Sequence, residues 1–248
     1  THPEALRRLV ELAFDAGAAE VTVGESEAYE GRRAALYETI RALVSPLGGT
    51  VVNFNDEPFE TVKVPEPVHF AEVKVARAVM RCDVLINAPT LKTHGLVGVT
   101  ASVKNYYGVI PREDKGRYHR LDRVEEAIID LYQARPSDLT VVDGTYSTIH
   151  WGPREDFPET HRLDIALAST DSIAADAVSA RIIGVDPSKL RYLRWAEQRG
   201  LGTADLARIG VVGGPVNAGR RATTTTVEFN NRRCRQIRII DCASCTGC

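Results

Sequence analysis

Three cysteines close to the C-terminal end of the chain have the spacing of an iron–sulfur ligand set. Cys242, Cys245 and Cys248 stand three residues apart, so a short loop can present three thiolates to one cluster. A fourth ligand is left open: Cys234, a residue beyond position 248, or no protein group at all. We predict a 4Fe-4S cluster, and a zinc site or unliganded thiols are the alternatives.

The charge around these cysteines is strongly positive. The segment from Arg208 to Arg238 carries seven arginines and a single acid, Glu228. Nearby positive charge favours the thiolate form that binds iron. The alternative is a basic strand edge that discourages aggregation.

A second group of reactive side chains follows a short apolar run at residues 84–86, which we expect to be a buried strand. Lys92, Thr93 and His94 come directly after it, and residues 91–123 carry seven Lys or Arg against three Asp or Glu. In open α/β sheets, ligands bind beyond the carboxyl ends of strands. An amine, a hydroxyl and an imidazole at that position suit a carboxylate or a phosphate.

Further candidates for this substrate site come later in the sequence: Lys104, Asn105, Lys115 and His119. We expect the first two on a helix facing the site, and the last two to close over it from a flexible loop at residues 111–116. His94 or His119 is the candidate proton donor, because imidazole titrates near neutral pH. Lys92 is the third catalytic candidate.

Three aspartates complete the predicted substrate-binding set. Asp143 and Asp171 each follow a predicted strand, at residues 139–142 and 165–168, and we expect both on the ligand side. The alternative for Asp171 is a helix N-cap. Asp176 lies among alanines on the following helix, where a buried carboxylate needs a partner and could hold a lysine or histidine in place. The alternative for Asp176 is an exposed helix face.

The elements that must position these residues alternate between helix and strand, which predicts an α/β fold. We expect a mostly parallel sheet with helices on both faces, a small β excursion at residues 61–75, and a C-terminal cysteine cluster segment. Helices are expected at residues 1–16, 31–43, 124–131, 172–183 and 190–198, and further strands at 21–23, 50–54 and 209–212, with a loop at 90–98. Residues 1–218 then form the α/β domain, and residues 219–248 form final strands and the cluster-binding segment.

Composition excludes several classes of function. The 248 residues are 44% hydrophobic and 26% charged, with a formal net charge of −2, so the chain has no electrostatic signature of nucleic-acid binding. No run approaches the ~18 apolar residues of a membrane span. Neither a Walker loop nor a dinucleotide-binding glycine motif is present. Clustered cysteines in a chain with ample core favour a reducing compartment, so we expect a cytoplasmic protein.

Several short motifs occur along the chain: Asp83–Pro89, Leu91–Gly95, Lys104–Gly108, Val142–Gly144, Ser169–Asp171, Ala175–Ala177 and Gly200–Gly202. Together they resemble one protein family, the domain of unknown function 362. The similarity covers nearly the whole chain, and many relatives resemble iron–sulfur-centre proteins. It implies a fold and a cluster but no reaction.

We therefore predict an iron–sulfur protein, either an oxidoreductase or a cluster-dependent lyase, that acts on a small carboxylate-bearing anion. The alternative is a non-catalytic electron-transfer protein whose basic surface docks an acidic redox partner. Cys82 is expected to be a buried core thiol, although it could join the cluster across a homodimer.

Overall fold

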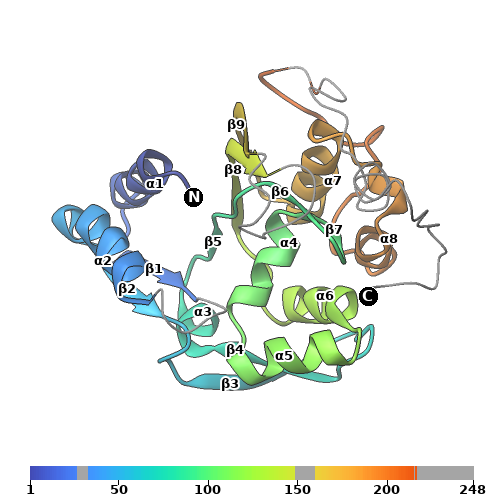
Figure 1. The fold of residues 1–248 in the computed structure, drawn as a ribbon, viewed down its shortest axis with the longest axis horizontal. Helices are drawn as coiled ribbons and strands as arrows, with labels where there is room; N and C mark the ends of the chain where they lie inside the picture. The colour runs from blue at the N-terminus through green and yellow to red at the C-terminus, as the bar shows by residue number, and fades with distance from the viewer. Residues whose placement is uncertain (27–32, 149–159, 215, 217–248) are drawn as a thin grey trace, which may run out of the picture.

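The computed structural model describes residues 1–26, 33–148, 160–214 and 216. The N-terminal elements are α1 (Pro3–Asp15), β1 (Thr22–Glu25), α2 (Arg33–Val44), the 3-10 helix η1 (Ser45–Leu47) and β2 (Thr50–Asn53). They lie together at one side of the molecule (Figure 1). β1 and β2 pair in parallel. Val10, Ile40 and Val44 are buried between these helices and strands, so this layer has a small core of its own.

The predicted β excursion is present as an antiparallel pair. β3 (Phe59–Lys63) pairs with β4 (Glu72–Ala76), and the short helix α3 (Arg77–Arg81) follows. The turn between the strands is held by Asp130, whose carboxylate accepts hydrogen bonds from the backbone N–H groups of Val68, His69 and Phe70 at 2.6, 3.0 and 2.7 Å. One buried side chain thus fixes the second half of this turn.

The central sheet contains three strands in the order β5-β8-β9. β5 (Ile86–Asn87) runs parallel to β8 (Leu139–Thr148), whereas β9 (Thr160–Ser169) is antiparallel to β8. A second pair, β6 (Lys92–His94) and β7 (Gly98–Thr100), forms an antiparallel hairpin beside this sheet.

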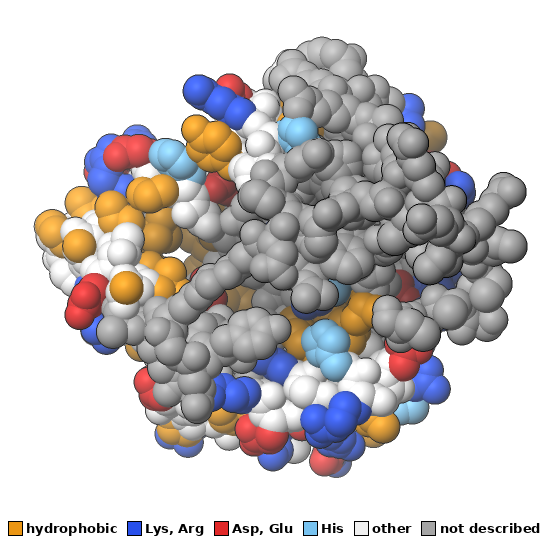
Figure 2. Space-filling view, viewed as in Figure 1, with side chains coloured by type: hydrophobic (Ala, Val, Ile, Leu, Met, Phe, Trp, Pro, Cys, Tyr) orange, Lys and Arg blue, Asp and Glu red, His pale blue; other side chains and the backbone are white. Residues whose placement is uncertain are grey.

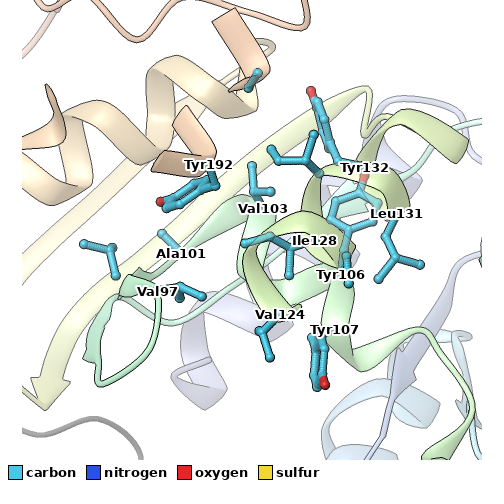
Figure 3. Packing of buried hydrophobic residues seen from close by; sticks show 14 of the residues in the cluster. Val97, Ala101, Val103, Tyr106, Tyr107, Val124, Ile128, Leu131, Tyr132 and Tyr192 are labelled. Atoms are coloured by element: carbon cyan, nitrogen blue, oxygen red, sulfur yellow. The ribbon is translucent and has the colours of Figure 1, made fainter. Parts of the chain in front are cut away.

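Helices from the second half of the chain enclose the main core. They are α4 (Ser102–Asn105), η2 (Tyr106–Gly108), α5 (Arg112–Arg120), α6 (Val124–Ala134), α7 (Ser172–Ile182), η3 (Pro187–Lys189) and α8 (Arg191–Gln198). α6 and α7 are buried along most of their length. Figure 3 shows Val103 of α4 beside Ile128 of α6, with Tyr192 of α8 close by. The core therefore joins α4, which carries Lys104, to the buried helix α6 and to α8.

The architecture is a mixed α/β fold, but the prediction of one mostly parallel sheet was wrong in its detail. Among the described residues, β1/β2 and β5/β8 are parallel, and β3/β4, β6/β7 and β8/β9 are antiparallel, in four small sheets. Only eleven residues separate β8 from β9. A parallel crossover needs a dozen or more, usually with a helix. Apolar runs predict strands but carry no information on pairing direction.

Four local predictions were also wrong. Val84 is 63% exposed, and the strand expected at residues 84–86 is reduced to β5. The loop expected at 90–98 contains β6 and the start of β7. Residues 112–116 begin α5, where Pro111 occupies the N-cap and acidic residues fill the first turn, so they are not a flexible loop. Residues 209–212 form no strand.

The final strands and the cysteine segment predicted for residues 219–248 lie outside the described residues. Across the part of the chain that the structure describes, none of the helices has the length and apolar character needed to cross a membrane.

Candidate anion-binding site

The basic residues predicted for the substrate site come from three elements that meet in space. Lys92 and His94 lie on β6, Lys104 lies on α4, and Lys115 and His119 lie on α5. Their charges are close enough to interact: besides burial, Lys104, His119 and Lys92 lower the pKa of His94, and Lys92 and Lys115 lower the pKa of Lys104. Figure 2 shows basic and histidine side chains on the lower part of this face, where Figure 1 places α5.

The path of β6 is fixed by its contact with β8. The Leu91 N–H donates to the Asp143 carbonyl at 2.8 Å, and the Thr93 hydroxyl donates to the Thr148 carbonyl at 3.2 Å. Side chains alternate along a strand, so Lys92 and His94 share one face while Thr93 points to the other. Thr93 is buried, whereas Lys92 and His94 are partly buried. Thr93 therefore serves to anchor the strand, and its predicted contact with substrate remains a prediction.

His94 is held as a neutral imidazole with a defined tautomer. Its Nδ1 accepts hydrogen bonds from the backbone N–H groups of Leu96 and Val97 at 3.1 and 3.4 Å, so the ring proton is on Nε2. Burial lowers the pKa of His94 to about 3, with further lowering by the positive charges of Lys104, His119 and Lys92. At neutral pH His94 can donate a hydrogen bond from Nε2 without carrying charge.

Lys104 lies at the centre of the cluster. Its Nζ is 4.1 Å from the centroid of the Tyr107 ring. Burial lowers the pKa of Lys104 to about 7, with additional lowering by Lys92 and Lys115. Burial also lowers the pKa of Lys92, an effect that Glu25 opposes. Neither ammonium forms an ion pair or a hydrogen bond with another described residue.

Lys115 and His119 are joined to the cluster through Tyr107. The Lys115 Nζ donates to the Ser26 hydroxyl at 2.6 Å, and that hydroxyl in turn donates to the Gly108 carbonyl. The Tyr107 hydroxyl lies 2.8 Å from the His119 Nδ1, which is 2.9 Å from the Lys115 carbonyl. These contacts tie α5 to η2 and to the residue that follows β1.

Asp176 positions the helix that carries Lys104. Its carboxylate accepts hydrogen bonds from the N–H groups of Ser102 and Val103 at 2.6 and 3.2 Å and from the Tyr192 hydroxyl at 3.1 Å. Burial raises the pKa of Asp176 to about 6, although these hydrogen bonds act in the opposite direction. Asp176 therefore contacts the backbone of α4 and the hydroxyl of Tyr192, which leaves it no direct role in the basic cluster.

The other predicted polar residues are not gathered at the basic cluster. Asp171 caps α7 and also accepts a hydrogen bond from the Thr203 N–H at 2.9 Å, which agrees with the N-cap alternative. Asp143 accepts hydrogen bonds from the N–H groups of Thr145 and His2. Burial alone would raise the pKa of Asp143, but the hydrogen bonds outweigh burial, so its pKa is lowered. The sequence predicted both aspartates on the ligand side of the sheet, but β8 and β9 are antiparallel, so Asp143 and Asp171 do not share one sheet edge.

Asn105 is likewise committed to a structural contact. Its side-chain amide donates to the Asn87 Oδ1 at 2.8 Å, and the Asn87 amide donates to the Ser102 carbonyl at 2.8 Å. This pair joins the end of β5 to α4. A substrate contact through Asn105 remains a prediction.

Two contributors were missed from the sequence. Tyr107 stands three residues after Lys104, a spacing that places neighbours on one helical face and could have revealed it. Ser26 is 89 residues from Lys115 in sequence, and no local pattern connects the two.

The predicted cluster ligands Cys234, Cys242, Cys245 and Cys248 lie outside the described residues, so the cluster remains a prediction. Within the described ranges, no group of three or more His, Cys, Asp or Glu side chains could hold a metal ion. Cys82 is partly buried, and its thiol donates to the Val79 carbonyl at 3.3 Å.

Comparison with known proteins identifies the family. The thylakoid-associated protein sll1697 from Synechocystis sp. is 27% identical over 207 residues, which is 81% of this chain. The chain spans about 62% of the length of that relative. No solved structure matches the chain. The family model called Domain of unknown function (DUF362) matches residues 1–181, a range that contains the whole basic cluster. The chain therefore belongs to the DUF362 family.

Proposed function

We propose that this chain binds a small carboxylate-bearing anion at Lys92, Lys104 and Lys115, as the substrate of an iron–sulfur enzyme. One observation carries the proposal: two partly buried ammonium groups, Lys92 and Lys104, lack any ion pair among the described residues. Holding like charges together in partly buried positions costs free energy, which an incoming anion offsets.

Burial favours a small anion over a protein partner. Lys92, His94 and Lys104 are all partly buried, whereas a surface that docks a protein keeps its lysines solvated at the rim. The neutral His94 adds an uncharged Nε2–H donor beside the ammonium groups. An anion with a carboxylate and a second polar group would use both kinds of donor.

The iron–sulfur part of the proposal is supported by donor chemistry alone. Thiolates at three-residue intervals, as in Cys242, Cys245 and Cys248, fit a 4Fe-4S cluster. When bound, such a cluster supplies electrons or an open iron that acts as a Lewis acid. The described residues would bind and orient the anion through Lys92 and Lys115 and hold a proton at the His94 Nε2.

Calorimetric titration with acetate, malonate, glyoxylate and phosphate tests the anion site. We expect Lys92→Ala to weaken binding by about 10- to 100-fold, because a hydrogen bond to a charged group contributes about 1.5–3 kcal/mol. Lys74→Ala is the matched control, since Lys74 is an exposed lysine on β4 away from the cluster. Equal affinity in both variants would contradict the proposal. Salt-sensitive binding of an acidic redox protein without small-anion binding would favour the electron-transfer alternative.

Anaerobic purification tests the cluster separately. We expect a brown protein with about four irons and four sulfides per chain and an electron paramagnetic resonance signal that changes with dithionite. A colourless protein that holds zinc would exclude the cluster.

A further inference from the structure

The helix that carries Lys104 is held in place by Asp176. Asp176 binds the two N–H groups at the start of α4, Ser102 and Val103, and the Tyr192 hydroxyl binds that carboxylate in turn. Asp176 and Ser102 are fully buried, so this end of α4 cannot shift without disturbing the core. The Tyr107 ring limits the other end of the side chain, 4.1 Å from the Lys104 Nζ.

The groups that face Lys104 favour its uncharged form. Burial lowers the pKa of Lys104 most, and the positive charges of Lys92 on β6 and Lys115 on α5 lower it further. His94 lies in the same cluster as a neutral ring whose own pKa is lowered by burial and then by Lys104, His119 and Lys92. Burial raises the pKa of Tyr107, so its hydroxyl stays protonated and brings no negative charge. The negative charge of Glu25 raises the pKa of Lys92 but does not shift the pKa of Lys104.

We propose that Lys104 is a nucleophilic amine that forms an imine with the carbonyl group of a 2-oxo acid bound at this site. The inference rests on the proposed anion site and adds to it a substrate class and a covalent step. A lysine placed beside other cations and away from water is the usual arrangement for amine nucleophiles in proteins.

The chemistry balances without a further reactant. The Lys104 Nζ attacks the carbonyl carbon, a C–N bond forms, and the carbonyl oxygen leaves as water with the two protons of the amine. The carboxylate of the oxo acid would lie against Lys92 and Lys115, next to the carbonyl carbon. The His94 Nε2–H can donate a hydrogen bond to the carbonyl oxygen as negative charge develops there.

The titration of Lys104 fits this role. With its pKa lowered to about 7, roughly half of the amine is unprotonated at neutral pH. A lysine at the ordinary value of about 10.4 is unprotonated in less than about a thousandth of molecules. Lower basicity reduces intrinsic nucleophilicity, so we expect an advantage in imine formation of at least about tenfold.

Reductive trapping with glyoxylate and cyanoborohydride at pH 7 tests the inference, using the full chain. The hydride reduces the imine to a stable carboxymethyl-lysine, which peptide mapping assigns to one of the six lysines in the sequence. The exposed lysines provide internal references: Lys63, Lys74 and Lys189. We expect Lys104 to be modified at least about tenfold faster than these. Lys104→Arg keeps the positive charge and should lose this fast adduct.

The outcomes separate the inference from the proposed function. Glyoxylate that binds by calorimetry yet gives no preferential adduct at Lys104 would overturn the imine and leave the anion site standing. Equal modification of all accessible lysines would overturn the imine too. If glyoxylate does not bind, and Lys92→Ala has the same anion affinity as Lys74→Ala, both the anion site and the imine are overturned.

Discussion

Replacing Asp176 by asparagine should change how the stability of the protein depends on pH. The carboxyl group is fully buried, and its pKa is raised to about 6 from an ordinary value of about 3.9. Two pKa units at 1.36 kcal/mol each correspond to about 3 kcal/mol. Because the folded state holds the proton more tightly, this stabilisation is complete below about pH 4 and is lost as the pH rises through about 6.

The assay is urea unfolding of the wild type and of Asp176→Asn at intervals from pH 4.5 to 8. We expect the asparagine variant to gain about 2 kcal/mol in unfolding free energy relative to the wild type across this range, since asparagine does not titrate and part of the full effect is already lost at pH 4.5. Taking the difference between the two proteins removes the contribution of other titrating groups.

Tyr192→Phe is the matched control for the direction of this effect. The Tyr192 hydroxyl donates to the Asp176 carboxylate and lowers its pKa, so phenylalanine should move the midpoint of the pH dependence upward. A stability difference between wild type and Asp176→Asn that stays constant within about 0.5 kcal/mol from pH 4.5 to 8 would refute the reasoning.

Two further expectations concern Lys104 and Asp130. Malonate affinity, measured by calorimetry, should fall by up to about tenfold between pH 6 and pH 8, because the Lys104 ammonium loses its proton near pH 7. The malonate affinity of Lys104→Arg should stay constant over the same range, because arginine does not lose its proton there. Asp130→Asn should lower the unfolding free energy by about 2–4 kcal/mol, because an amide cannot accept all three N–H groups of residues 68–70; a loss below about 0.5 kcal/mol in urea unfolding would contradict this role.

Local periodicity was enough to predict most helices and several strands. The apolar spacing predicted α1, α2, α6 and α7 to within a few residues, and the strands β1 and β2 in the same way. It could not predict how strands pair, because the direction of pairing depends on connections and on neighbours far away in sequence. β8 and β9 illustrate this, since each was predicted and their antiparallel arrangement was not.

The basic cluster was predictable only in part. Lys92, His94 and Lys104 were expected at one site because their segments are consecutive along the chain. The partner of Asp176 could not be predicted, since the backbone that it binds is more than 70 residues away. A buried carboxylate needs hydrogen-bond donors, but the sequence does not say whether these are lysines or backbone amides.

The aspartates around the site bind backbone N–H groups instead of lysines, and this determines what the lysines can bind. Aspartates near the cluster and in the core accept hydrogen bonds from backbone N–H groups: Asp130, Asp143, Asp171 and Asp176. Each is thereby committed to holding a turn, a strand or a helix end, and none of them forms an ion pair with Lys92 or Lys104. A lysine buried for structural reasons is normally paired with an acid. Neither Lys92 nor Lys104 forms such a pair with another described residue, so we expect the balancing negative charge to arrive with the ligand.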